Sequence, residues 1–290
     1  MSQIQDYPSL FSLAEVWDCT RQQGIMTTHQ PAAAEYPAIT DARAHRLLLA
    51  GCSKLVITSR NASACADAVK SLQSLSTGAT VLSLPADLSS PSEVERFVKG
   101  LTTMTDGRVD ILIANAGATW GAPFDTHSDA AFDKVMNLNV RSVFNLIRLC
   151  TPLLEGAVKR SGEKARVVTV GSIAGLQIGA VGERGTYGYA ASKAAVLHLT
   201  KHLAVELGPR GILLNAIAPG FFPSKMANAI IALLGGEESM GKACPDGRLG
   251  RPEDIVGSVV FLCSRAGEHI NGVVLPIDGG AHVVPSWAKL

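Results

Sequence analysis

The sequence has no excess of charge of either sign. Lysine and arginine together number 26 against 25 acidic residues, which gives a formal net charge of +1. A chain this close to neutral lacks the long-range field that attracts nucleic acid or an anionic membrane surface. We therefore expect a small molecule as the natural partner and no nucleic acid.

Disulfide and metal-binding patterns are also lacking. The six cysteines lie far apart, without a C-x-x-C pair or the accompanying histidines of a zinc site. The sequence thus predicts reduced thiols and no metal site.

No segment predicts secretion or a membrane span. The start of the chain has no basic region followed by the apolar core of a signal peptide. The longest apolar stretch, 167–182, is interrupted by polar residues and is too short to cross a bilayer. The final Ala288-Lys289-Leu290 matches the small-basic-leucine pattern of a peroxisomal address. We expect a soluble intracellular protein in the peroxisome, with the cytoplasm as the alternative location.

What the chain does contain is an alternation of strands and helices. Runs rich in β-branched residues and leucine predict strands at 55–59, 80–84, 109–115, 166–171, 212–217 and 273–277. Helical patterns lie between them, at 61–75, 90–101, 128–154, 187–207 and 252–264. Near-continuous apolar strands joined through helices are typical of parallel pairing. The predicted fold class is α/β, a single Rossmann-type doubly wound parallel sheet.

One predicted helix carries a pair of residues that suits proton transfer. Tyr189 and Lys193 stand at i and i+4 on one face, whereas Tyr187 has Ala191 at that spacing. A nearby ammonium group stabilises a phenolate, which lowers the phenol pKa from about 10 toward neutrality. Carbonyl reduction needs such a proton donor, and Ser172 could hold the carbonyl oxygen. The alternative for this pair alone is a buried tyrosine beside a solvated lysine.

Further motifs occur in an order that resembles the short-chain dehydrogenase/reductase family. They cover roughly residues 47–282 and include Ile113-Ala-Asn-Ala-Gly117, Asn137 to Phe144, Gly171-Ser172, Tyr189-Ala-Ala-Ser-Lys193, Pro219-Gly220, Gly250 to Asp254 and Asp278-Gly-Gly280. Within the family, the chain is most similar to 3-oxoacyl reductases of the rhamnolipid-pathway type and their fungal relatives, through segments 59–67, 86–90, 115–122 and 218–226.

The resemblance implies a catalytic set of four residues. Tyr189 would be the general acid, and Ser172 would orient the substrate oxygen. Lys193 would bind the nicotinamide ribose and lower the pKa of the tyrosine. Asn139 would hold a water molecule of the proton relay.

The resemblance also implies a site for NADP(H). The residues implied to bind it are Arg60, Asp87, Asn115, Gly117, Tyr189, Lys193, Pro219 and Gly220. Asp87 would contact the adenine, Asn115 to Gly117 would border the adenosine ribose, and Pro219-Gly220 would lie beside the nicotinamide. Arg60 directly follows a predicted strand, where an NAD enzyme usually has an acid, and would suit a 2′-phosphate.

Two segments depart from the family pattern. Ser172 precedes Tyr189 by 17 residues, a few more than is usual, and the excess falls in 179–185, a loop that would border the substrate pocket. The second departure is the absence of T-G-x-x-x-G-x-G, the loop that lets the backbone approach the cofactor diphosphate. Residues 15–40, where this motif should begin, contain one glycine and no convincing strand.

We therefore expect the first strand and the glycine-rich loop to be degenerate or missing. That strand would lie in the middle of the sheet, and its loss would leave two inner edges without hydrogen-bond partners. Residues 16–20 and 24–28 are poor substitutes. The predicted organisation is an atypical N-terminal segment, 1–45, and a short-chain dehydrogenase/reductase domain, 46–290. A gene-model fault in the first segment is the favoured explanation, and a genuine segment predicts weak cofactor binding.

Residues and resemblance together predict an NADPH-dependent reductase of a 3-oxoacyl thioester or a related ketone. The peroxisomal address favours a coenzyme A thioester and a fatty-acid-like or secondary-metabolite route. Two alternatives stay open: an alcohol-oxidising dehydrogenase of the same family, and a non-catalytic binding or assembly protein that lost its nucleotide loop. The resemblance also suggests a homotetramer built through the helices at 128–154 and 187–207.

Overall fold

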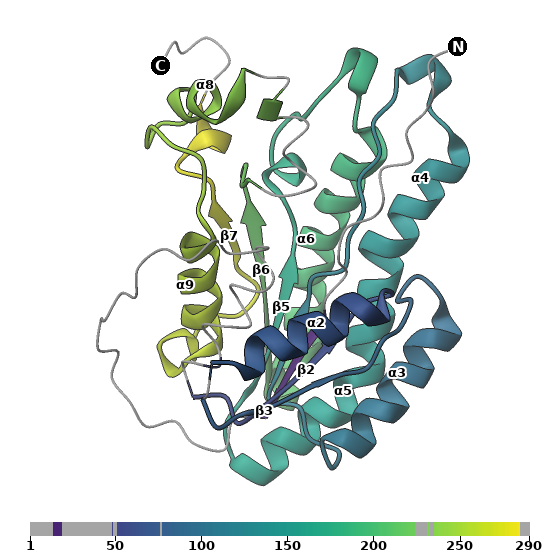
Figure 1. The fold of residues 1–290 in the computed structure, drawn as a ribbon, viewed down its shortest axis with the longest axis vertical. Helices are drawn as coiled ribbons and strands as arrows, with labels where there is room; N and C mark the ends of the chain where they lie inside the picture. The colour runs from purple at the N-terminus through teal and green to yellow at the C-terminus, as the bar shows by residue number, and fades with distance from the viewer. Residues whose placement is uncertain are drawn as a thin grey trace.

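The fold is an α/β sheet flanked by helices (Figure 1). The computed structural model describes residues 14–18, 48, 51–75, 77–223, 231–232 and 235–284. Its seven-stranded sheet has the order β3-β2-β1-β4-β5-β6-β7. The strands are β1 (Ala14–Asp18), β2 (Lys54–Thr58), β3 (Thr80–Ser83), β4 (Ile111–Ala114), β5 (Ala165–Val170), β6 (Ile212–Pro219) and β7 (Val274–Ile277).

The six strands from β2 to β7 overlap the six apolar runs of the sequence. β2 pairs with β3 in parallel, and β4 to β7 pair in parallel in chain order. The inner strands are mostly apolar, and Leu112 and Ile113 of β4 are fully buried. Helices on both faces explain this burial. The predicted doubly wound sheet is confirmed.

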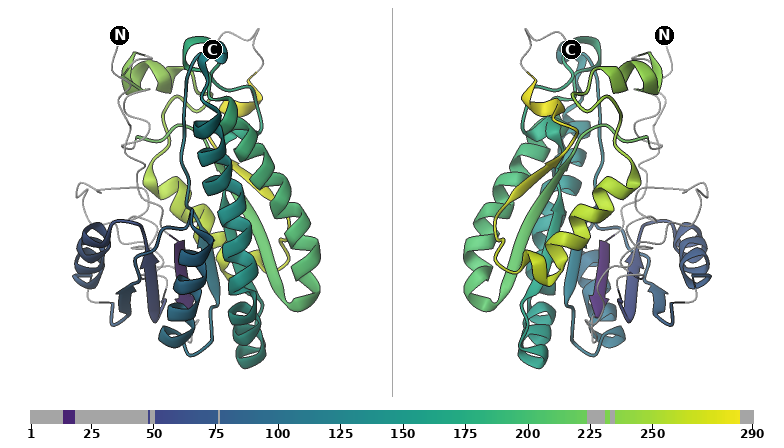
Figure 2. Two further views of the ribbon diagram at one scale, coloured as in Figure 1. Left: turned by 90° about the vertical axis from the view of Figure 1, so that its right-hand side faces the viewer. Right: turned by 90° about the vertical axis from the view of Figure 1, so that its left-hand side faces the viewer.

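Two layers of helices enclose the sheet (Figure 2). The helices are α2 (Ala62–Gln73), α3 (Pro91–Met104), α4 (Asp129–Met136), α5 (Ser142–Ser161), α6 (Tyr187–Leu207), α8 (Gly236–Lys242) and α9 (Pro252–Cys263). One core cluster joins the sheet to α3, α5 and α6 through residues such as Phe97, Leu146 and Val196. A second cluster lies against the other face and includes Leu72 of α2 and Val259 of α9. Each face therefore has its own apolar core.

The long helix predicted at 128–154 is interrupted. α4 begins after Ser128, whose hydroxyl accepts a hydrogen bond from the Ala131 amide at 3.3 Å. A π-helical turn, Asn137–Arg141, then separates α4 from α5. Turns of this kind are rare and occur frequently at functional sites. The interruption places Asn139 of the predicted catalytic set in such a turn.

The first strand is present, but it runs in the opposite direction to its neighbours. Ala14 of β1 pairs with Thr58 at the end of β2 and with Ala114 at the end of β4, and Asp18 pairs with Lys54 at the start of β2. The expectation of a missing strand is thus corrected, because the backbone of β1 pairs with both inner edges. The alternative at 24–28 lies outside the described residues, as do most of the predicted segment 1–45 and the C-terminal tripeptide.

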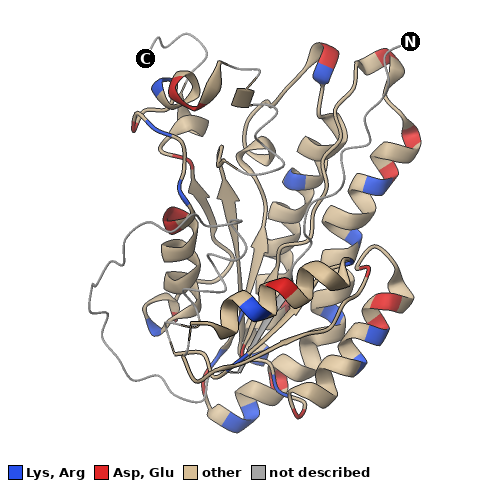
Figure 3. Cartoon of the chain, in the orientation of Figure 1, with Lys and Arg blue, Asp and Glu red and all other residues tan. Residues whose placement is uncertain are grey.

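The surface carries both signs of charge. Lysine and arginine alternate with acidic residues over the helices in Figure 3, in keeping with the near-zero net charge. Among the described residues, no helix is both long enough and apolar enough to cross a membrane.

Candidate active site

The polar residues predicted to carry chemistry follow neighbouring strands. In the parallel pairing, Ala114 of β4 lies beside Thr169 of β5, and Val170 of β5 lies beside Ile217 of β6. The residues just beyond these strand ends therefore gather at one edge of the sheet, where open α/β sheets bind their ligands. α6 adds Tyr189 and Lys193 to this edge.

Asn139 is held tightly and is almost fully buried, with 1 % of its surface exposed. Its Nδ2 donates to the Ala118 carbonyl and to Ser192 Oγ, both at 2.9 Å, and its Oδ1 accepts from the Ala118 amide at 2.8 Å. Both amide hydrogens are thus used. The resemblance predicts a water molecule bound at Asn139. That water would have to donate a hydrogen bond to the remaining lone pair of Oδ1 or bind to backbone groups of the residue.

Ser192 belongs to the same cluster, although it is not one of the residues predicted from the sequence. The side chain is fully buried, and its Oγ donates to the Tyr189 carbonyl at 2.7 Å while accepting from Asn139. It therefore joins the π-helical turn to the first turn of α6. Its position beside Lys193 in the tyrosine-lysine motif is the sequence feature that could have indicated this role.

Lys193 lies in an environment that disfavours its charge. The side chain is 5 % exposed, and its Nζ donates to the Val170 carbonyl at 2.8 Å and lies 5.6 Å from the centroid of the Tyr189 ring. Burial lowers the pKa of the ammonium group to about 8. The group therefore changes protonation state close to neutral pH.

Burial raises the pKa of the Tyr189 phenol, and the Ser172 side chain lowers it in part as a hydrogen-bonding partner. The expectation that Lys193 brings this pKa toward neutrality is wrong for the protein alone. Desolvation of the phenol has the larger effect, and Nζ is bonded to a strand carbonyl above the ring face. The phenol is consequently kept in its protonated form.

Two glycines allow close approach around these side chains. A Cβ on Gly117 would lie 3.4 Å from both Lys193 Nζ and Asn139 Oδ1. A Cβ on Gly175, three residues after Ser172, would lie 2.6 Å from backbone atoms of Lys193 and Ala194. The Ser172 loop therefore packs directly on α6 and brings the serine to the tyrosine.

The residues that the family resemblance implies for binding the two ends of a dinucleotide follow strands at the same edge of the sheet as Tyr189. Arg60 is exposed just after β2 and makes no ion pair with any described residue. Asp87, after β3, accepts bonds from the Ser89 amide at 2.9 Å and the Ser89 hydroxyl at 2.7 Å. Gly220, after β6, has no room for a side chain, because its Cβ would lie 2.7 Å from Cβ of Asp278. Asn115 directly follows β4 and is partly buried.

These residues fit the adenosine and nicotinamide ends of a dinucleotide, but the diphosphate cradle differs from the family's. The glycine-rich motif is missing from the sequence. Since β1 is antiparallel, its last residue, Asp18, lies at the edge of the sheet opposite Ala114. The carboxyl end of β1 is therefore not beside the carboxyl ends of β2 and β4, where open α/β sheets bind their ligands.

Tyr187 belongs to a cluster of aromatic rings. Its ring packs edge-on against Phe124 at 5.7 Å and against His127 at 5.9 Å between centroids. The neighbouring loop is tied to the segment after β4, since the Ala122 amide donates to the Gly185 carbonyl at 3.1 Å. The longer loop at 179–185 is therefore anchored at this end.

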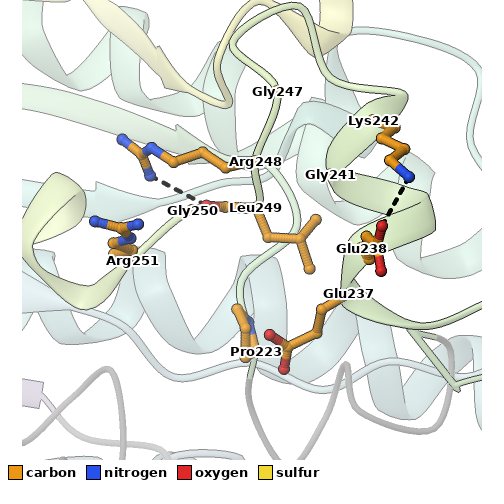
Figure 4. A pocket seen from close by; sticks show the side chains of 10 residues that line it. All are labelled: Pro223, Glu237, Glu238, Gly241, Lys242, Gly247, Arg248, Leu249, Gly250 and Arg251. Atoms are coloured by element: carbon orange, nitrogen blue, oxygen red, sulfur yellow. Dashed lines mark hydrogen bonds and ion pairs between the residues drawn. The ribbon is translucent and has the colours of Figure 1, made fainter.

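A hollow of about 340 Å³ lies between α8 and the segment before α9 (Figure 4). Two of the three cations that line it are paired, because Lys242 bonds to Glu238 at 2.7 Å and Arg248 bonds to Asp254 at 2.7 Å, and the third is Arg251. None of the predicted site residues lines it. The predicted catalytic residues therefore lie outside this hollow.

Comparisons with known proteins agree with this geometry. A family model described as "Enoyl-(Acyl carrier protein) reductase" matches residues 33–282. The rhamnolipids biosynthesis 3-oxoacyl-[acyl-carrier-protein] reductase of Pseudomonas aeruginosa is 40% identical over 240 residues, which cover 83% of this chain and 90% of that protein. The 3-oxoacyl-[acyl-carrier-protein] reductase FabG of Staphylococcus aureus is 34% identical over 206 residues, 71% of this chain and 79% of that protein.

Solved structures show the same similarity. The Pseudomonas aeruginosa RhlG/NADP active-site complex has a TM-score of 0.76 and 40% identity, with 84% of this chain and 92% of that chain covered. Levodione reductase also has a TM-score of 0.76, at 30% identity, with 86% and 95% covered.

Proposed function

Because the chain belongs to the short-chain dehydrogenase/reductase family, we propose that it reduces a 3-oxoacyl thioester, or a related ketone, with NADPH. The observation that carries this proposal is that Asn139, Ser172, Tyr189 and Lys193 gather at the carboxyl edge of the sheet, with Asn139 and Lys193 buried and Ser172 and Tyr189 partly exposed. The similarity to 3-oxoacyl reductases supports the substrate class, and a relative solved with NADP supports the cofactor.

The residues then have defined roles in the reduction. NADPH, when bound, supplies the hydride that reduces the carbonyl carbon. Ser172 donates a hydrogen bond to the carbonyl oxygen, and Tyr189 transfers its phenolic proton to that oxygen, which completes the hydroxyl group. Lys193, when protonated, binds the ribose hydroxyls. Its positive charge also stabilises the negative charge that Tyr189 carries after it has given up its proton. Asn139 and Ser192 position the first turn of α6.

The protonation state of Tyr189 supports reduction over alcohol oxidation. Oxidation needs a phenolate to accept the alcohol proton, whereas reduction needs a phenol to donate one. Burial raises the phenol pKa, so the donor form predominates at neutral pH. The exposed Arg60 after β2 supports NADPH, the phosphorylated cofactor, as the reductant.

Apolar side chains around the site suit an acyl chain. Phe124 is 74% exposed, and Ile178 and Val181 in the segment after Ser172 are 87% and 66% exposed. Exposed apolar groups that cluster beside a polar centre mark a surface for an apolar ligand. The tripeptide Ala288-Lys289-Leu290, as a peroxisomal address, favours coenzyme A as the thiol and a fatty-acid-like or secondary-metabolite pathway.

We also propose assembly into a homotetramer through α4–α5 and α6. Apolar residues on these helices remain exposed in one chain, including Phe144 at 39% and Val205 at 79%. A second copy would cover them. Sedimentation as a monomer at micromolar concentration would contradict this assembly.

The second candidate is a non-catalytic binding protein, favoured by the missing glycine-rich loop and the reversed β1. If the N-terminal segment arises from a gene-model fault, a clean transcript will lack residues within 15–40. A transcript that encodes them unchanged contradicts that explanation.

The two tyrosines of α6 provide the test of function. We expect Tyr189→Phe to lower the reduction of 3-oxoacyl-coenzyme A by about 10²- to 10⁴-fold, because the proton donor is lost. Tyr187→Phe removes a hydroxyl from the neighbouring aromatic cluster and should retain most of the activity. The rate of NADPH oxidation measures both. Equal activity of Tyr189→Phe and the unmodified protein would remove this residue from the mechanism.

A further inference from the structure

Two histidines stand one turn apart on the solvent-exposed side of α6. His198 and His202 occupy positions i and i+4, and both are exposed. Side chains at this spacing lie above one another on a helix. The pair is separate from the catalytic set, whose members on the same helix, Ser192 and Lys193, are buried.

The two imidazoles already have the geometry of a chelating pair. Their Nε2 atoms lie 3.2 Å apart, and the ring centroids lie 4.8 Å apart with an interplanar angle of 71°. Imidazole nitrogens bind zinc at about 2.0–2.1 Å, so two of them at a tetrahedral angle stand about 3.3 Å from one another. The spacing of the two Nε2 atoms therefore matches that of two ligands of one ion, which would take the place of the hydrogen bond between the rings.

We propose that His198 and His202 bind one divalent transition-metal ion through their Nε2 atoms. Imidazole suits Zn²⁺, Ni²⁺ and Cu²⁺, whereas Mg²⁺ and Ca²⁺ prefer oxygen ligands. Within the described residues, no group of three His, Cys, Asp or Glu side chains could hold a metal. The remaining coordination positions are thus filled by water or by ligands from a second molecule.

This site departs from the sequence-based expectation of no metal. That expectation rested on cysteine spacing and on the absence of a complete ligand set. Two histidines four residues apart in a sequence do not by themselves predict a metal site. The helix places both rings on one side, and the distance between their Nε2 atoms then indicates metal binding.

The test is a titration of the full, untagged chain with ZnSO₄ after removal of metal by a chelator. We expect saturable binding by the unmodified protein, with one ion per chain or one ion per two chains. His198→Gln and His202→Gln should each weaken binding by roughly tenfold or more, since even the loss of an outer-shell partner costs about 10- to 100-fold. Binding of Cu²⁺, followed by electron paramagnetic resonance, should show coupling to two imidazole nitrogens.

His269→Gln is the matched control, because His269 is an exposed histidine outside this pair. It should bind Zn²⁺ as the unmodified protein does. The unfolding temperatures of all three variants without metal show whether any loss of binding comes from a loss of folding, since His198 and His202 lie on the helix that we propose packs against a second copy. No saturable binding, or equal binding by the double variant His198→Gln/His202→Gln, would overturn the proposal.

Discussion

At the scale of single residues, burial decides how the two groups of the tyrosine-lysine pair titrate. The spacing of Tyr189 and Lys193 in the sequence predicts that they share a helix face, and they do. The direction of the tyrosine pKa shift was predicted wrongly, because spacing reveals a neighbouring charge but not the loss of water around the phenol. In the folded chain, desolvation raises the pKa of the phenol and lowers that of the ammonium group.

We expect the catalytic efficiency with NADPH to fall as the pH rises through about 8. The pKa of Lys193 is lowered to about 8, so its ammonium form predominates below that pH and is lost above it. Tyr189 stays protonated over this range, because its pKa is raised. The pH profile of kcat/KM reports groups of the free enzyme and measures this change.

Lys201→Met is the control for the pH profile, because Lys201 is an exposed lysine on the same helix. This variant should keep the decline at alkaline pH. A profile that stays flat through about pH 9 would show that deprotonation of Lys193 does not limit the reaction.

We also expect the choice of cofactor to depend on one residue, Arg60. We expect Arg60→Asp to lower the preference for NADPH over NADH by about 10- to 100-fold, the equivalent of one charge-assisted hydrogen bond. The ratio of kcat/KM values for the two cofactors measures it. Lys70→Asp makes the same change of charge on the exposed side of α2 and should leave the ratio unaltered. An unaltered ratio in Arg60→Asp would exclude this arginine as the phosphate ligand.

At the scale of elements, strands and helices follow the sequence closely except where tertiary geometry intervenes. α6 spans the predicted 187–207 in full, since an uninterrupted helical pattern and the following Gly208 fix its ends. The predicted helix at 128–154 contains a π-helical turn that no residue pattern announces. This turn depends on long-range hydrogen bonds from Asn139 to Ala118 and Ser192.

The loop after β5 provides a test at the level of elements. We expect Gly175→Ala to destabilise the fold by about 1–3 kcal/mol, because its Cβ would overlap the backbone of α6 at 2.6 Å. The shift should also move Ser172 away from Tyr189 and reduce turnover. Thermal unfolding and the reductase assay measure the two effects.

Gly179→Ala is the control within the same loop, because its Cβ would meet its nearest neighbouring atom at 3.7 Å, an ordinary contact. It should keep both stability and activity. Equal stability of the two variants would show that the loop adapts and does not fix the serine.

At the scale of the whole molecule, the reversed first strand separates this chain from the family pattern. The sequence indicates the missing glycine-rich loop, but it does not indicate that β1 pairs antiparallel with both neighbours. Strand direction depends on how the chain connects around the sheet, and an atypical segment carries no motif for that connection. β1 completes the sheet between β2 and β4. The residues at the adenosine and nicotinamide ends would have to hold the cofactor without a glycine-rich loop.

The central claim is that this chain binds NADPH at the edge occupied by Tyr189 and Lys193, and its most direct test is a titration of the full chain with NADPH that follows the unfolding temperature. A ligand that binds only the folded state stabilises it by about 2.7 kcal/mol at a hundredfold excess over Kd. We predict a saturable rise of roughly 5 °C, since 1 kcal/mol corresponds to about 2 °C for a chain of this size. Tyr189→Phe should show the same rise. An unchanged unfolding temperature at millimolar NADPH would contradict the account and favour the non-catalytic binding protein.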